Sequence, residues 1–347
     1  MLHFDCDYMA GAHPEVLRRL TETNLEQTSG YGFDPYTQHA ERLILDACGI
    51  APDADGTPHG RVFFLVGGTQ TNATVIDGLL TRHEGVLAAE TGHVNVHEAG
   101  AIEAGGHKVL VLPQHDGKVS AEDVNRYISD FYRDDTYPHM VAPGMLYISF
   151  PTELGTLYTL DELKALHTVC QRYRIPLYID GARLGYGLAA SPDVTLADIA
   201  RLSDVFYIGG TKVGTLFGEA VVVKEPAILP HFFSLVKQHG ALLAKGRLTG
   251  IQFETMFTDD LYMRVSRHAV AMAMHLKEAF LAKGYRLYID SPTNQQFFVL
   301  PNADMDRVMQ HVSFEVWGTR GEHETPVRLV TDWSTREEDI AALVDML

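Results

Sequence analysis

Two short stretches, YIDGAR at residues 178–183 and GGTK at residues 209–212, decide the fold of this chain. Each ends or follows a run of apolar, β-branched or aromatic residues, PLYID at 176–180 and DVFYIG at 204–209, of the kind that forms buried strands. Polar and charged residues therefore stand at the ends of two predicted strands. In an open parallel sheet, that edge is where ligands bind.

The same pattern recurs along the middle of the chain. Further strands are predicted at 61–66, 85–90, 108–112, 145–150 and 219–223. Helical stretches lie between strands, at 71–82, 120–132 and 159–174. Because strands that alternate with helices are typical of α/β proteins, we expect a doubly wound, mostly parallel sheet of seven strands.

The two ends of the chain have a different texture. After about residue 250 the sequence predicts helices at 260–284, 304–311 and the C-terminus, and strands at 286–290, 296–300 and 326–331. This pattern indicates a smaller α+β domain. The first 50 residues contain helical stretches at 13–28 and 37–48 and no strand pattern. We expect an N-terminal arm (1–30) that packs on the core or on a neighbouring subunit, a large domain (31–248) and a small C-terminal domain (249–347).

Composition excludes several classes of protein. The 347 residues are 46% hydrophobic and 21% charged, as in globular domains. A net charge of −17 repels phosphate backbones and anionic lipids, so we expect no nucleic-acid partner and no membrane partner. Three cysteines without a CxxC pair, and no leader or membrane-spanning run, indicate a cytoplasmic protein without structural disulfides.

Candidate functional residues follow four of the predicted strands. GGTQTN at 67–72 is a glycine turn into a helix whose first amides suit a phosphate. Asp180 ends its strand, where a carboxylate can stabilise a protonated pyridine nitrogen, and Arg183 can bind a substrate carboxylate. Lys212 supplies an amine at the same edge, and His93 supplies an imidazole that can stack on a ring or transfer a proton.

Each of these features has a simpler explanation on its own. Glycine turns are common, a strand-end aspartate can cap the next turn, and a lone lysine is usually solvated. His93 and His97 are four residues apart, but the pattern is not HExxH and no third ligand is evident, so we expect no metal. Together, however, the glycine turn, histidine, aspartate and lysine are the parts that a pyridoxal phosphate site requires.

The chain resembles the threonine aldolase family of fold-type I pyridoxal phosphate enzymes, also called β-eliminating lyases. The resemblance covers nearly the whole chain. The segments that carry it are Gly30-Tyr31-Gly32 with Asp34, GGTQTN at 67–72, GHVNVHEAGA at 92–101, YIDGAR at 178–183, GGTKVG at 209–214, Lys245-Gly246-Arg247 and VRLVTD at 327–332. It implies a lyase with a pyridoxal 5'-phosphate cofactor and a small amino acid substrate.

The resemblance also implies roles for single residues. Lys212 would form the Schiff base, Asp180 would face the pyridine nitrogen, and His93 would stack on the ring. The other residues implied to hold the cofactor are Gly68, Thr69, Arg183 and Arg247, the last possibly contributed by a neighbouring subunit. Those implied to contact the substrate are Cys6, Tyr31, Arg183 and Arg328, with His139 near its hydroxyl as a second catalytic histidine beside His93.

Three positions depart from the family pattern. Cys6 stands in place of a serine, FPTE at 150–153 in place of asparagine-threonine-histidine, and Asp332 in place of a histidine. We therefore expect a divergent branch whose preferred β-substituent need not be methyl.

The expected reaction is retro-aldol cleavage of a β-hydroxy-α-amino acid, such as L-threonine, to glycine and an aldehyde. The same parts would serve a β-elimination, which stays open. A non-catalytic nucleotide- or phosphate-binding module is a further alternative, although neither GxGxxG nor GxxxxGK[ST] is present. Because Tyr31 and the 245–247 stretch make sense as parts of a neighbour's site, we expect a homodimer or homotetramer with shared active sites.

Overall fold

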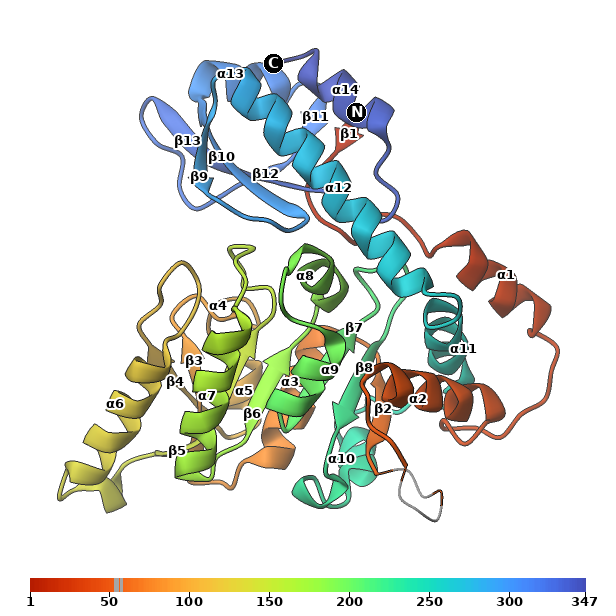
Figure 1. The fold of residues 1–347 in the computed structure, drawn as a ribbon, viewed down its shortest axis with the longest axis vertical. Coiled ribbons are helices and arrows are strands. Elements are labelled where there is room, and N and C mark those ends of the chain that lie inside the picture. The colour runs from red at the N-terminus through yellow and green to blue at the C-terminus, as the bar shows by residue number, and fades with distance from the viewer. Residues whose placement is uncertain (53–55, 57–58) are drawn as a thin grey trace.

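The seven predicted strands form one sheet in the computed structural model, which describes residues 1–52, 56 and 59–347. The strand order is β2-β8-β7-β6-β5-β3-β4, and all neighbours are parallel except β8, which runs antiparallel to both β7 and β2. The strands are β2 (Arg61–Leu65), β3 (Glu84–Ala89), β4 (Lys108–Leu112), β5 (Ala142–Ser149), β6 (Leu177–Asp180), β7 (Val205–Gly209) and β8 (Glu219–Val223). The predicted α/β architecture is confirmed (Figure 1).

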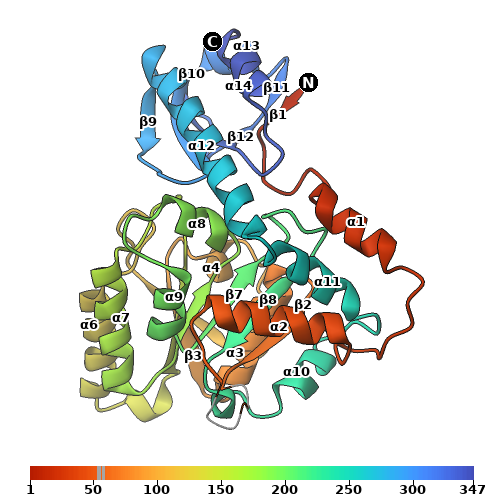
Figure 2. The same ribbon diagram turned by 45° about the vertical axis from the view of Figure 1, so that its right-hand side comes forward.

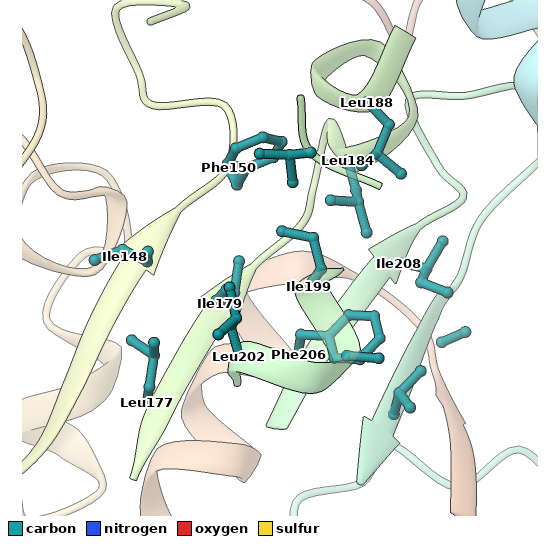
Figure 3. Close-up of a cluster of buried hydrophobic side chains, with 14 of the residues drawn as sticks. Ile148, Phe150, Leu177, Ile179, Leu184, Leu188, Ile199, Leu202, Phe206 and Ile208 are labelled. Carbon is teal, nitrogen blue, oxygen red and sulfur yellow. The ribbon is translucent and has the colours of Figure 1, made fainter. Parts of the chain in front are cut away.

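Apolar side chains alternate between the two faces of this sheet, as the period of a strand requires. On β6, Leu177 and Ile179 enter one buried cluster, and Tyr178 enters the cluster on the other face. Figure 3 shows the first cluster, in which strand residues such as Ile148 and Phe206 meet side chains from the covering helices. Buried helices on both faces therefore make a three-layered large domain.

The helices of the large domain agree with the predicted ones to within a few residues where both exist. They are α2 (Pro35–Ala47), α3 (Gly68–Leu79), α4 (His93–Val96), α5 (Ala101–Ala104), α6 (Ala121–Arg133), α7 (Leu160–Tyr173), α8 (Leu184–Ala190), α9 (Leu196–Leu202), α10 (Phe232–Gln238) and α11 (Arg247–Met256), with 3-10 turns η1 (Tyr137–His139) and η2 (Pro226–Ile228). Their starts follow ordinary capping: Thr159 and Glu162 form a capping box on α7, and Ser120 caps α6.

The small domain follows the long helix α12 (Leu261–Ala282) and lies above the large domain in Figure 1. Its antiparallel sheet has the order β12-β13-β10-β9. The elements are β9 (Arg286–Ile289), β10 (Gln295–Pro301), α13 (Asn302–Val308), β11 (Val312–Ser313), β12 (Glu315–Val316), β13 (Glu324–Val330) and α14 (Glu337–Val344). An α+β domain at the C-terminus is therefore confirmed.

The N-terminal segment contains a strand that the sequence pattern does not predict. β1 (Leu2–His3) pairs in parallel with β11, and Phe4 is buried in the apolar core of the small domain. A strand of two residues is too short to show any periodicity. After crossing to the large domain the chain forms α1 (Pro14–Glu22), which packs against α11 (Figure 2). None of the described helices has the length and apolar character needed to span a bilayer.

Candidate active site

A pocket of about 290 Å³ opens at the carboxyl edge of the sheet. It is lined by side chains from the N-terminal segment and from the loops after β2, β3, β5, β6 and β7. Six residues that the sequence singles out meet there: Gly68, Thr69, His93, Asp180, Arg183 and Lys212. The loops that follow parallel strands bring these residues together from positions more than a hundred residues apart.

Asp180 is the most heavily hydrogen-bonded group of the pocket. Three neighbouring strands direct side chains to the same face, so that the hydroxyls of Tyr147 on β5 and Tyr207 on β7 donate to Asp180 at 2.7 and 2.5 Å. The Asn72 side-chain amide and the Ala182 backbone N–H donate at 2.9 and 3.0 Å. Burial alone would raise the pKa of Asp180, but the nearby His93 and these hydrogen bonds outweigh it and lower the pKa. Asp180 is therefore held as a carboxylate.

Lys212 lies in the turn after β7, within the pocket. Burial, and after it the charge of Arg183, lower the pKa of its amine below the ordinary value. Its Nζ lies 6.0 Å from the centre of the Tyr8 ring and forms no ion pair with any described residue. An amine of lowered pKa that is not tied up by a carboxylate is suited to nucleophilic chemistry.

Helix α3 presents its N-terminus to the same pocket. It begins at Gly68, its N-cap is Gly67, and no side chain caps its first amides. A Cβ at Gly67 would meet nothing within 4 Å, so the space in front of these amides is open. Free amides at the positive end of a twelve-residue helix are a site for an anion such as a phosphate.

Arg183 is bound by a carboxylate that the sequence reasoning missed. Its Nε and Nη2 donate to the two oxygens of Asp7 at 2.7 and 3.0 Å, and Asn294 of the small domain donates to Asp7 at 3.0 Å. Asp7 and Arg183 are separated by 176 residues, so no local pattern could pair them. Burial tends to raise the pKa of Asp7, but Arg183 and Lys212 prevail and lower it.

Arg328, on β13, lies near this pair without lining the pocket. Its Nη1 donates to the Gln295 side-chain carbonyl at 2.9 Å, its Nη2 donates to Glu315, and its guanidinium lies 5.1 Å from the Trp317 ring centre. Burial, then the charge of Arg183, lower its pKa. Its buried Nε has no partner among the described residues.

The histidine side of the pocket contains a second missed carboxylate. His93 Nδ1 lies 2.8 Å from Glu98 Oε1, and Asn72 donates to the same oxygen at 2.7 Å. Burial would lower the pKa of His93, but Glu98 and Asp180 outweigh it and raise the pKa. Glu98 directly follows His97 in the sequence, yet only the fold shows that its side chain turns inward.

Two further carboxyls line the pocket and were not predicted. Glu153 accepts hydrogen bonds from Ser149 and from the His93 backbone N–H at 2.6 and 3.0 Å. Glu219, at the start of β8, accepts from Thr211 at 2.7 Å, and burial raises its pKa to about 8. Because β8 runs antiparallel, its first residue lies at the carboxyl edge of its neighbours, which reasoning from strand ends cannot anticipate.

His139 does not line this pocket, so its predicted place near the substrate hydroxyl stays a prediction. It ends η1, directly before β5, and is exposed to solvent. β5 starts at Ala142 and ends at Ser149 in the pocket, so His139 lies before the opposite end of the strand. Within one chain, a residue before a parallel strand lies away from the ligands that gather after it.

Cys6, Tyr31 and Arg247 also lie outside the pocket. Cys6 lines a separate hollow with Asp332, so both of these departures from the family pattern sit beside the pocket and not in it. Tyr31 is 43% exposed, with Lys237 Nζ 4.8 Å from its ring centre. Arg247 donates to the backbone carbonyls of Glu26 and Asn24 at 2.8 and 3.0 Å and thereby holds the N-terminal segment.

Comparisons with known proteins agree with this geometry. The beta-eliminating lyase family profile matches residues 4–298. A low specificity L-threonine aldolase of Pseudomonas aeruginosa is 30% identical over 79% of this chain and 77% of its own length, and one of a Pseudomonas species is 29% identical over 77% and 74%. A solved structure of Leishmania major threonine aldolase superposes with a TM-score of 0.94 at 39% identity, covering 99% of this chain and 98% of that one.

The match of fold and of sequence extends over most of the molecule. A Thermus thermophilus aspartate aminotransferase shares the fold alone, with a TM-score of 0.71 at 16% identity. The chain belongs to the beta-eliminating lyase family.

Proposed function

We propose that this protein is a pyridoxal phosphate-dependent lyase that cleaves a β-hydroxy-α-amino acid of the L-threonine type to glycine and an aldehyde. The observation that supports this most directly is the meeting of the Lys212 amine, the Asp180 carboxylate and the α3 N-terminus in one pocket. The relatives that match over most of their length are L-threonine aldolases. The convergence of these three groups is an observation of this structure and is independent of the sequence matches.

The residues of the pocket fit the cofactor. A carboxylate held by four donors suits a protonated pyridine nitrogen, uncapped helix amides suit a phosphate dianion, and an amine of lowered pKa suits an aldehyde carbon. When bound, pyridoxal phosphate supplies an electron sink for the carbanion left at Cα. Gly68 and Thr69 would hold the phosphate, Asp180 the ring nitrogen and Lys212 the aldehyde carbon.

The chain's own residues would bind and orient the substrate. Arg183, fixed in position by Asp7 through Nε and Nη2, would present its Nη1 donors to the substrate carboxylate, and Arg328 adds a second positive charge nearby. His93 accepts the proton of the β-hydroxyl at Nε2, because Nδ1 is engaged by Glu98. Asp180 remains ionised throughout and so stabilises positive charge at the ring nitrogen.

Tyr31 and Arg247 are proposed to act in the site of a neighbouring copy. Both lie outside the pocket of their own chain, and Tyr31 and Phe33 expose 43% and 60% of their surface. Exposed aromatic side chains beside a cation are typical of interface residues. We infer a homodimer or homotetramer in which this segment completes the partner's pocket.

The reaction is tested by identifying products together with cofactor absorbance. The purified full chain should show visible absorbance on addition of pyridoxal phosphate and should release glycine and acetaldehyde from L-threonine. Lys212→Ala should lose both, whereas Lys283→Ala, which removes an exposed lysine at the end of α12, should lose neither. A keto acid and ammonia in place of glycine would assign β-elimination, and an unchanged spectrum in Lys212→Ala would refute the role of Lys212.

A further inference from the structure

A buried hydrogen-bonded chain links the two ends of the predicted ring site. Glu98 Oε1 lies 2.8 Å from His93 Nδ1 and 2.7 Å from Asn72 Nδ2. The same Asn72 nitrogen lies 2.9 Å from Asp180 Oδ2. The side chain of Glu98 is fully buried, and its second oxygen has no partner among the described residues.

The partners fix the orientation of Asn72. Its nitrogen faces two carboxylate oxygens, which only accept, and its Oδ1 accepts from the Tyr178 hydroxyl at 2.9 Å. The flipped amide would place an oxygen against two carboxylates. Asn72 therefore donates one N–H to Glu98 and the other to Asp180. It thereby holds the two carboxylates apart, one on each side of its amide.

The same reasoning fixes the imidazole. A carboxylate accepts hydrogen bonds and does not donate them, so His93 Nδ1 carries a proton toward Glu98. Nε2 then carries the lone pair of the neutral ring, and it has no hydrogen-bond partner in the part of the chain that the structure describes. His93 lines the pocket and retains 35% side-chain exposure, so Nε2 is available to a substrate.

We propose that Glu98 is a positioning residue, which holds the proton of His93 on Nδ1, directs Nε2 to the substrate hydroxyl and, through Asn72, locks His93 to the Asp180 carboxylate. The part about the hydroxyl rests on the proposed function. The part about the imidazole concerns the chain alone.

Several charged groups lie near His93 and shift its pKa in opposite directions. Glu98 and Asp180 favour the protonated ring, while Lys212 disfavours it. Glu153 contacts the His93 backbone N–H, and the His97 ring lies 5.6 Å away. The charge of His93 in turn lowers the pKa of His97. Removing the Glu98 charge should therefore lower the pKa of His93 and, as a second effect, raise that of His97.

The test is histidine-selective ¹⁵N NMR of the full-length protein, with and without pyridoxal phosphate, using His93→Ala to assign the resonance. In the native protein, at a pH above its pKa, the neutral His93 ring should show a proton on Nδ1 and a lone pair on Nε2. In Glu98→Gln its pKa should fall by about one unit or more, while His97 shifts slightly upward. Glu103→Gln, which removes an exposed carboxylate one turn further along the chain, should change neither.

Catalysis provides a second measurement. In Glu98→Gln, kcat for L-threonine should fall more than KM changes, and the acid limb of the pH profile should move to lower pH by the shift measured for His93. Glu98→Asp, which retains the charge, should restore the raised His93 pKa in part, and it also serves if Glu98→Gln does not fold.

Three results would overturn the proposal. They are a neutral native His93 ring with its proton on Nε2, a His93 pKa that is the same in folded Glu98→Gln, and a Glu98→Asp protein that titrates like Glu98→Gln. Failure of the proposed reaction is a separate outcome, because it would appear as absent glycine production while the NMR result stands.

Discussion

Two buried carboxyl groups at the same edge of the sheet have pKa values shifted in opposite directions. Asp180 receives four hydrogen bonds and lies near His93, so it is ionised. Glu219 receives fewer hydrogen bonds, and burial dominates and raises its pKa to about 8. The number of donors and the nearest charge, not the depth of burial, decide between them.

The raised pKa of Glu219 makes stability depend on pH. Its ordinary pKa is 4.5 and its folded pKa is about 8, so the native state holds this proton more tightly than the unfolded chain does. The resulting stability is complete below the unfolded pKa and is lost as pH rises through the folded pKa. We predict that the free energy of unfolding of the cofactor-free protein falls between about pH 5 and about pH 8, and that Glu219→Gln flattens this fall.

Urea unfolding across that pH range measures the effect. Glu90→Gln removes an exposed carboxylate near the same sheet and should leave the slope unchanged. An equal slope in Glu219→Gln and the native protein would contradict the assignment.

Asp7 determines how well Arg183 can bind a carboxylate. Asp7→Asn removes the charge and one acceptor of the two-pronged contact, so Arg183 gains freedom to rotate. We predict that KM for the amino acid rises about tenfold while kcat changes less, because orientation of the substrate is lost before chemistry begins. Asp5→Asn, on the same segment but bonded to Ser313, is the matched control and should retain the native KM.

The sequence predicts Asp180, Lys212 and the glycine turn because each directly follows a strand with a clear apolar pattern. It does not predict Asp7, Glu98 or Glu219. Asp7 precedes any element of the large domain, Glu98 turns inward from the loop between the four-residue helices α4 and α5, and Glu219 starts the one antiparallel strand of the sheet. Those positions depend on tertiary packing, which local patterns do not contain.

At the level of elements, close approach of β6 and β7 explains the glycines in YIDGAR and GGTK. A Cβ at Gly181 would lie 1.9 Å from the Tyr207 carbonyl oxygen, and the Gly209 N–H donates to the Gly181 carbonyl at 2.9 Å. Because no side chain lies between Gly181 and Gly209, the ends of β6 and β7 approach closely, and Asp180 and Lys212 lie in one pocket. The sequence predicts β6 and β7 well because their residues before Asp180 and Gly209 are all apolar, with side chains buried alternately on the two faces of the sheet.

Substitution of Gly181 tests this packing. Gly181→Ala should destabilise the protein by about 1–3 kcal/mol or more, because backbone must move to admit the Cβ. Gly67→Ala offers the comparison, since its Cβ would meet open space and its φ of −165° is extended backbone that alanine adopts. Thermal or urea unfolding of the two variants should separate them clearly; equal stability would contradict the close contact.

The two candidate histidines lie at different ends of the sheet. His139 precedes β5, whereas His93 lines the pocket. We predict that His93→Ala lowers the rate of threonine cleavage by about a hundredfold or more, and that His139→Ala has little effect. Steady-state kinetics of both variants at saturating cofactor provide the measurement. A comparable loss in His139→Ala would mean that a neighbouring copy supplies this histidine.

For the molecule as a whole, a few cations stand out within an acidic protein. The net charge is −17, yet Lys212 and Arg183 line the pocket and Arg328 lies nearby, where a phosphate and a carboxylate are expected. A field of this kind disfavours polyanions and still admits a small dianion at a helix N-terminus.

Shared sites can be detected by mixing inactive variants. If Arg247 serves the neighbouring copy, Arg247→Ala and Lys212→Ala should each be poorly active alone. After unfolding and refolding together, mixed oligomers contain one intact site, so we predict that activity returns to roughly a quarter of the native value in a dimer. No recovery, with mixed oligomers demonstrated by sedimentation, would show that each chain builds its site alone.

The parallel pairing of β1 with β11 has a topological consequence. The chain begins in the small domain, crosses to the large one past Asp7 and Tyr8, and returns through α12, so the domains are joined by two covalent tethers. With two tethers the small domain can pivot about the line between them but cannot swing freely. Residues 2–4 thus anchor the N-terminal segment, and with it Asp7 and Tyr8, to the small domain.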